Sequence, residues 1–303
     1  MRKVIRRFAF AGMILCLAPI VWNHCQSLQH RAQQERLRGR VKRAEAQQLA
    51  GTYGAAQGTG VPAPAAGRAA AGADGRDEPD SAYGQAGKGQ YGTGQAGTEA
   101  AWHGTAGDDA APAVLEKYAD LYAENDEMAG WLSIEGTRID YPVMQSEDDE
   151  YYLRHDFYGR DNKYGCLYVK DQADLEAGTN FIIYGHHMKD GAMFGDLDLY
   201  AEEGFYREHP SFSFDTLYEE RTYDIMAVFQ SRLYDEEDDV FPYYRFYEAE
   251  TREEFDDFYD NVKALSLYDT GVEARFGDTF LTLSTCAYHV KDGRFVVVAK
   301  RRE

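Results

Sequence analysis

The C-terminal two thirds of the chain contains many short runs rich in β-branched and aromatic residues, and this pattern restricts the possible folds most. Turn signals such as Glu135-Gly136 and Asp190-Gly191 separate the runs. Seven runs are predicted as strands: 130–134, 139–145, 165–169, 180–184, 223–231, 278–285 and 294–300. Helical segments are predicted at 114–125, near 196–206 and at 250–265. Many short strands with few helices predict a mainly β protein, a closed barrel with helical insertions.

The first 25 residues combine a basic start with an uncharged apolar run, FAFAGMILCLAPIVW, over residues 8–22. A run of this length is short for a membrane span, which usually needs about 17–25 residues. It fits the core of a signal peptide, which is about 7–15 residues long, but no A-x-A cleavage pattern follows it. We therefore expect an uncleaved membrane anchor or signal-anchor at 1–25. A cleaved signal peptide and a buried helix are the alternatives.

Two segments of different composition separate this start from the predicted barrel. Residues 26–50 are polar, basic and helix-favouring, and are predicted as a juxtamembrane segment along the membrane surface. In residues 51–112, fifteen Gly and seventeen Ala fill 32 of the 62 positions. Such a composition buries too little apolar surface to offset the loss of chain entropy on folding. We expect a disordered spacer there, followed by one catalytic or binding domain at 113–303.

Charge and cysteine content exclude several classes of protein. The chain has 32 basic and 52 acidic residues, a net charge of −20, which argues against a general nucleic-acid binder. Its mean hydropathy of −0.58 excludes a polytopic membrane protein. Only Cys166 and Cys286 lie in the predicted barrel, and their separation fits no zinc-binding pattern. We expect neither a metal nor a cofactor.

Three predicted strands have chemically capable residues at their ends. Cys286 ends the strand FLTLSTC, where an exposed thiolate could act as a nucleophile. His186 follows the strand NFIIYG and could exchange protons. Arg294 begins the strand RFVVVAK and could donate hydrogen bonds to an oxyanion. Each residue also has a structural alternative, namely a core thiol, an exposed turn histidine and an edge charge paired with a carboxylate.

Together these motifs resemble those of the sortases, the cysteine transpeptidases of Gram-positive bacteria. TLSTC ends at Cys286, the histidine of a GH motif is His186, and Arg294 begins a valine-rich terminal strand. The resemblance is closest to class B, through GWLSIEGTRIDYPVMQ, YYLRHDF and YGHHMKDGAMFGDL, and covers about residues 113–303. It implies an eight-stranded sortase-type β-barrel. An N-terminal helix and an inserted helix before the catalytic-cysteine strand complete that fold.

The resemblance also implies a reaction of the peptidase class. Cys286 would attack a threonine carbonyl in the C-terminal sorting signal of a secreted protein. Arg294 would stabilise the oxyanion, and His186 would protonate the leaving amine. An amine of a peptidoglycan precursor or of a pilin would then resolve the thioacyl-enzyme. The family's arrangement implies a cell-membrane protein with a single N-terminal span and an extracellular catalytic domain.

Tyr184 and Ser284 are predicted to contact substrate, because they precede His186 and Cys286 by two positions and share their side of each strand. Packing within the barrel is the alternative for both. Three other functions remain open at this point. They are a pilin-polymerising sortase, a hydrolytic cysteine protease of the same fold, and an adhesin in which Cys286 is unreactive.

Overall fold

Short strands dominate the part of the chain that the structure describes. This computed structural model describes residues 2–56, 112–232, 241–286 and 293–303, and the side chains among them except those of residues 2–20, 53–56 and 286. The strands are β1 (Met128–Ser133), β2 (Asp140–Gln145), β3 (Leu167–Val169), β4 (Asn180–Gly185), β5 (Ser211–Thr216), β6 (Thr222–Arg232), β7 (Phe280–Cys286) and β8 (Gly293–Arg301). The α-helices are α1 (Arg2–Ala56), α2 (Glu116–Tyr122), α3 (Glu203–Glu208) and α4 (Arg252–Leu265). Three 3-10 turns are η1 (Tyr151–Leu153), η2 (Leu197–Ala201) and η3 (Tyr243–Arg245).

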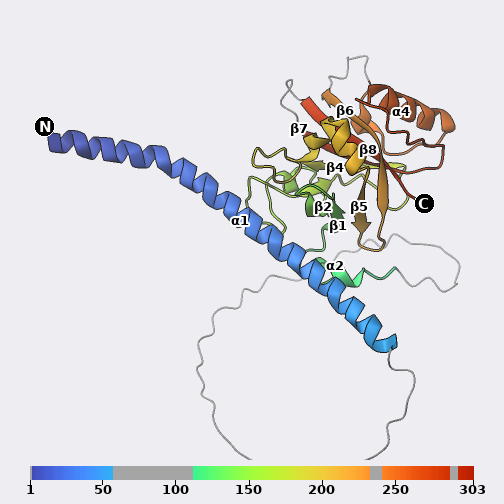
Figure 1. The fold of residues 1–303 in the computed structure, drawn as a ribbon, viewed down its shortest axis with the longest axis horizontal. Coiled ribbons are helices and arrows are strands. Elements are labelled where there is room, and N and C mark those ends of the chain that lie inside the picture. The colour runs from blue at the N-terminus through green and yellow to red at the C-terminus, as the bar shows by residue number, and fades with distance from the viewer. Residues whose placement is uncertain (1, 57–111, 233–240, 287–292) are drawn as a thin grey trace, which may run out of the picture. The chain divides into compact units, whose positions relative to one another are not determined.

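The eight strands form a closed barrel in the order β1-β2-β3-β4-β7-β8-β6-β5 (Figure 1). Strands β2 and β3 are parallel, as are β4 and β7, and the other neighbours are antiparallel. The predicted fold class is confirmed. Strand β5 was not among the seven predicted runs, although its sequence SFSFDT alternates strictly and buries Phe212 and Phe214. Strand β5 directly follows the helical segment around α3. The hydrophobic spacing changes there from that of a helix to that of a strand within a few residues, so the start of the strand is hard to recognise from the sequence.

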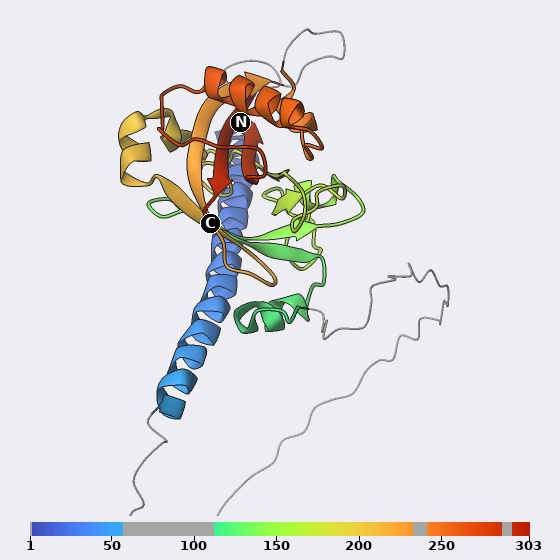
Figure 2. The same ribbon diagram turned by 90° about the vertical axis from the view of Figure 1, so that its right-hand side faces the viewer.

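Alternate residues of each strand fill the barrel interior. Phe181 and Ile183 of β4 meet Leu281 and Leu283 of β7 there, together with Val297 of β8. The residues between them face outward, where α4 covers β6, β7 and β8 (Figure 2). Helix α4 begins with a capping box between Thr251 and Glu254 and buries Phe255, Phe258 and Val262 against this outer surface. The site end of β4 and β7 is thus part of a rigid, close-packed sheet.

Helix α1 contains the apolar run at 8–22. No helix in the described ranges is long and apolar enough to cross a membrane. This finding contradicts the predicted single N-terminal span, and with it the predicted location at the cell membrane with an extracellular catalytic domain. The uncharged run is shorter than the roughly 17–25 residues of a usual span, and α1 continues beyond it through polar and basic residues.

The basic second half of α1 packs against the barrel domain. Arg40 pairs with Glu124 at 2.8 Å, and the Arg38 guanidinium donates to the Asp140 carbonyl at 2.8 Å. Leu37 is fully buried in the same contact. Residues 1–51 and 112–303 accordingly form one compact unit. Arg38 and Arg40, from the segment predicted to lie along a membrane surface, contact the acidic domain in this structure, and the juxtamembrane role of residues 26–50 stays a prediction. Most of the predicted spacer, residues 57–111, lies outside the described residues.

Candidate active site

Strand register brings His186, Cys286 and Arg294 to one edge of the barrel. In the parallel pair of β4 and β7, Gly185 lies opposite Thr285, and His186 is the next residue. In the antiparallel pair of β7 and β8, Cys286 lies directly opposite Arg294. Neighbouring strands are about 4.8 Å apart. The three residues therefore occupy adjacent positions across β4, β7 and β8, although about a hundred residues of chain separate the first from the other two.

The alternation of the strands turns His186 and Arg294 to the outer surface of the barrel. Phe295 points into the interior cluster, so Arg294 before it points outward. Gly185 takes the inward position before His186. A Cβ atom at Gly185 would lie 2.5 Å from the Leu167 Cδ2 atom. A larger residue at this position would therefore require the buried Leu167 and Phe194 side chains to shift, so glycine suits the position before the histidine.

The two threonines of TLSTC join β7 to β4. The Thr285 hydroxyl donates to the Gly185 carbonyl at 2.7 Å, and the Thr282 hydroxyl bonds to the Asn180 side-chain oxygen at 2.9 Å. Both hydrogen bonds are buried, where leaving either partner unsatisfied is costly. The Thr285 bond joins the two strand ends that precede His186 and Cys286, and the Thr282 bond joins β7 to the start of β4.

The imidazole of His186 is oriented by a backbone group. Its Nε2 atom lies 2.8 Å from the carbonyl oxygen of Leu153, the last residue of η1. A carbonyl oxygen only accepts hydrogen bonds, so Nε2 carries the hydrogen. In the neutral ring, Nδ1 is then the nitrogen that can take up a proton. Such an orientation suits a group that exchanges protons with a substrate.

The guanidinium of Arg294 lies at the start of β8, between β7 and β6. Cys286 is its pairing partner on one side and Ser231 on the other. One guanidinium nitrogen, Nη1, donates to the Gly293 carbonyl at 2.9 Å. The Arg294 side chain is half-buried and faces the surface on which His186 lies. An arginine in this position carries a permanent positive charge beside the strand end of Cys286.

The two predicted substrate contacts differ in their surroundings. Tyr184 is partly exposed, its ring stacks on Tyr168 with centroids 5.6 Å apart, and burial raises the pKa of its hydroxyl. Ser284 is 1% exposed, and its hydroxyl is hydrogen-bonded to the Tyr243 hydroxyl at 2.8 Å. A substrate would reach Ser284 only if Tyr243 moved aside. A substrate could therefore contact the Tyr184 side chain directly. Ser284 instead packs β7 against η3.

Two groups around the site were not identified from the sequence. The Leu153 carbonyl is a backbone atom, and no side-chain pattern reports its position. Tyr243 covers the outer side of β7 from the segment before α4. The only sequence signal for the Leu153 carbonyl was the motif YYLRHDF, which contains Leu153.

Cys166, the other cysteine of the barrel domain, is buried with Tyr152 and Phe157. Burial raises the pKa of its thiol, with a smaller contribution from the nearby Asp156 carboxylate. A buried, protonated thiol is a poor nucleophile. Cys166 is accordingly a packing residue.

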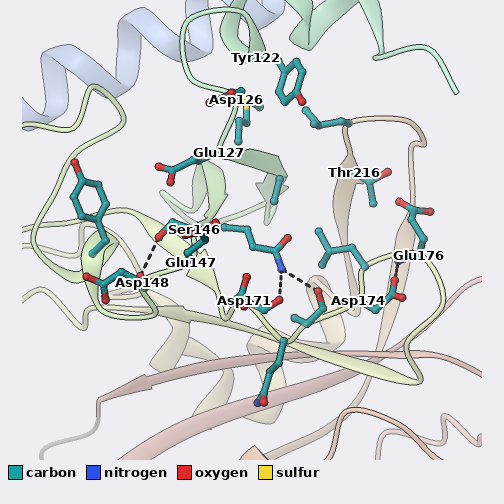
Figure 3. A pocket seen from close by; sticks show the side chains of 18 of the residues that line it. Tyr122, Asp126, Glu127, Ser146, Glu147, Asp148, Asp171, Asp174, Glu176 and Thr216 are labelled. Carbon is teal, nitrogen blue, oxygen red and sulfur yellow. Dashed lines mark hydrogen bonds between the residues drawn. The ribbon is translucent and has the colours of Figure 1, made fainter. Parts of the chain in front are cut away.

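The described part of the chain also contains an acidic pocket of about 1100 Å³, and Figure 3 shows the side chains that line it. The loops after β2, β3 and β5 form its walls. Seven carboxylates line it: Asp126, Glu127, Glu147, Asp148, Asp171, Asp174 and Glu176. None of the five predicted site residues is among the described residues of this lining. Within the described ranges, no group of three or more His, Cys, Asp or Glu side chains could hold a metal ion.

Comparison with known proteins connects this geometry to one family. A model of the sortase domain matches residues 132–302. The chain is 36% identical to sortase B of Listeria monocytogenes over 195 residues, which are 62% of this chain and 74% of that protein. A substrate complex of Staphylococcus aureus sortase B matches with a TM-score of 0.57 and 29% identity, covering 63% of this chain and 87% of that one. A sortase B complexed with triglycine matches with a TM-score of 0.56 and 29% identity, covering 62% and 86%.

Proposed function

Because this chain belongs to the sortase family, and within it to class B, we propose that it cleaves a C-terminal sorting signal after threonine and joins the protein to a cell-wall amine. The observation that supports this proposal most is the register of β4, β7 and β8. It aligns a histidine, a cysteine and an arginine on adjacent strands. These are the residue types that a cysteine transpeptidase needs for proton transfer, attack and oxyanion stabilisation.

In the first half of the proposed reaction, the Cys286 thiolate attacks the threonine carbonyl carbon of the sorting signal. A carbon–sulfur bond forms and the carbonyl electron pair moves to oxygen, where the Arg294 guanidinium stabilises the negative charge. The tetrahedral intermediate then collapses and breaks the carbon–nitrogen bond. His186, as imidazolium, gives its Nδ1 proton to the leaving amine. The product is a thioacyl-enzyme on Cys286.

In the second half, an amine replaces the leaving group. Neutral His186 accepts a proton at Nδ1 from the incoming amine, which attacks the thioacyl carbon. The new amide forms and the Cys286 thiolate leaves. The Leu153 carbonyl keeps Nε2 protonated throughout, so the same nitrogen, Nδ1, serves both steps. No redox step occurs, and atoms and charge balance without a cofactor.

The relatives support both substrate classes. One solved sortase B is a substrate complex and another is complexed with triglycine. Triglycine has a terminal amine, the kind of nucleophile that the second half-reaction needs. We propose by analogy that secreted proteins with a sorting signal and a peptidoglycan-precursor amine are the two partners of this chain.

The test uses the full chain and a pool of quenched fluorescent peptides, each with a different candidate sorting motif. Reactions run with and without a glycine-type or diaminopimelate-type amine, beside C286A, H186A and R294A variants. We expect cleavage that needs all three residues, and the added amine in the product by mass spectrometry. Cleavage with water alone as acceptor would identify a hydrolytic protease. Preference for a lysine-containing pilin peptide as acceptor would identify a pilin polymerase, and no cleavage of any peptide would overturn the enzyme assignment.

A further inference from the structure

Two separate segments hold His186 in place. The loop after β4, residues 186–196, folds back so that the Phe194 amide donates to the His186 carbonyl at 3.0 Å. The imidazole ring is held from a different part of the chain, the segment 151–166, through the Leu153 carbonyl. The direction of the ring therefore depends on how this loop and this segment lie relative to each other.

Asp190 connects the loop to the segment. It lies in the loop, and its Oδ2 atom accepts a hydrogen bond from the Tyr164 hydroxyl of the segment at 2.9 Å. Ser27 of α1 donates to the same oxygen at 2.8 Å, and the Arg31 guanidinium lies 4.0 Å away. Burial by itself would raise the pKa of the Asp190 carboxyl. The hydrogen bonds from Ser27, Tyr164 and the Ala192 amide, together with the Arg31 charge, outweigh burial, and the pKa lies below its ordinary value.

Arg138, in the turn between β1 and β2, holds the loop from the other side. Its guanidinium donates to the Asp190 carbonyl at 2.5 Å and to both Asp196 carboxylate oxygens, at 2.8 and 2.6 Å. Gly191 has a φ of +76°, and a Cβ atom there would collide with the Arg138 guanidinium. The loop therefore depends on glycine at this position. Arg38 of α1 donates to the Arg138 carbonyl at 2.8 Å.

We propose that Asp190 and Tyr164 are positioning residues for His186, and that Arg138 and Ser27 keep Asp190 in place. The hydrogen bond between Asp190 and Tyr164 sets the spacing between the loop that carries the His186 backbone and the segment that orients its ring. None of these residues touches the reacting atoms. Their effect on the reaction rests on the proposed function. Their effect on the His186 ring does not.

Kinetic measurements on the full chain test the first of these effects. Tyr164→Phe removes the connecting hydrogen bond, and Asp190→Asn removes the negative charge that strengthens it, each with little change in shape. We expect kcat to fall about tenfold while KM for the best-cleaved pool peptide stays unchanged, because small displacements of a catalytic group cost one to two orders of magnitude. The double variant should be no slower than the slower single variant, since both substitutions act on the same bond. We also expect both single variants to shift the pH profile of kcat.

The matched control is Tyr206→Phe. It removes a hydroxyl that donates to the Thr270 carbonyl at 2.9 Å, away from the 186–196 loop. We expect this variant to lose a similar amount of thermal stability and to keep the wild-type kcat and pH profile.

The second effect is measured without any substrate. Nitrogen-15 NMR of histidine-labelled protein, with His186→Gln used to assign the signal, reports which ring nitrogen is protonated. We expect the Nε2–H form of His186 in the wild-type chain and a loss of that preference in Tyr164→Phe and Asp190→Asn. Wild-type ring signals in both variants would overturn the proposal, even for a chain that cleaves no peptide. Wild-type kcat and pH profiles in both variants of an active chain would overturn it as well.

Discussion

The strand ends that carry the candidate site differ from the acidic pocket in the kinds of residue they hold. At the C-terminal end of β4, three neighbouring strands carry a histidine, a cysteine and an arginine side by side. In the pocket of about 1100 Å³, seven carboxylates come from loops and from the residues before β1 (Figure 3). The charged side chains among the described lining residues of the pocket are all acidic. A cavity with charge is therefore a weaker sign of catalysis than different groups held in strand register.

The difference has a structural cause. Residues at the site end are set by strand pairing, by the Thr285 hydrogen bond to the Gly185 carbonyl and by the Leu153 carbonyl. The acidic residues come instead from the loops 146–148 and 171–176 and from the two residues before β1. Catalytic groups need defined separations, which strands of a closed barrel supply. A solvated acidic surface needs no such precision.

The largest expected effect is at the central strand of the site. Cys286→Ala removes the proposed nucleophile, so peptide cleavage should fall at least about a thousandfold. The thioacyl adduct should also disappear from mass spectra of the enzyme mixed with peptide. Circular dichroism should show an unchanged fold. Substantial cleavage by this variant would mean that the register of β4, β7 and β8 does not mark the active site.

The next effect is at Arg294. Arg294→Lys keeps the positive charge but loses the planar arrangement of donors, and we expect kcat to fall about a hundredfold, the usual cost of losing an oxyanion donor. Arg302→Lys is the control, because Arg302 pairs with Asp224 at the far end of the β6 and β8 pair. A kcat close to that of the wild type for Arg294→Lys would show that charge alone suffices at this position.

A smaller effect is expected for the bond between the strand ends. Thr285→Val keeps the side-chain shape but leaves the Gly185 carbonyl unsatisfied, which should lower the free energy of unfolding by about 1–3 kcal/mol. We expect a several-fold lower kcat at a temperature well below unfolding, measured beside chemical denaturation. Thr270→Val, which loses a hydroxyl bond to the Met226 carbonyl, is the control and should keep kcat. If Thr285→Val and Thr270→Val had the same kcat, the Thr285 hydrogen bond would have no influence on the reaction.

The smallest effect is expected at the acidic pocket. The triple variant E147Q/D148N/D171N removes three of its seven charges, and kcat/KM for an uncharged peptide should change by less than about twofold, as for most surface substitutions. The salt dependence of kcat/KM should also stay unchanged for such a peptide. A loss of an order of magnitude would reverse the contrast between the candidate site and the acidic pocket, because the pocket would then lie on the path of the substrate.

Much of the site could be predicted because its signals are local. Each of the three residues can be recognised from its position relative to a predicted strand. The cysteine ends one strand, the histidine follows another and the arginine begins a third. The substrate contact predicted for Ser284, from its place two residues before Cys286, stays a prediction. The position was right for the strand face, but the hydroxyl of Tyr243 covers it. Burial of an outward-facing residue depends on what packs over the barrel, and no strand pattern contains that information.

The N-terminal segment shows the same limit on a larger scale. Its apolar run predicted a membrane span, which the absence of a sufficiently long and apolar helix in the described ranges contradicts. Its basic residues predicted a juxtamembrane segment, which stays a prediction. In the structure, Arg40 contacts Glu124 and Ser27 contacts Asp190, so this part of α1 lies against the domain. Each of these pairs joins residues far apart in the chain, and composition alone does not distinguish an anionic membrane from an acidic protein surface.

The amino-acid sequence alone determined three features of this protein. They are the strand-rich character of the domain, the three residue types of the candidate site and the glycine before His186. Those features depend on side-chain chemistry and on the two-residue period of a strand. Closure of the barrel decided that Cys286 lies between His186 and Arg294, that Leu153 orients the imidazole and that Asp190 joins two segments around it. Such contacts connect residues up to 163 positions apart. Only the balance of packing and hydrogen bonding over the whole domain selects them.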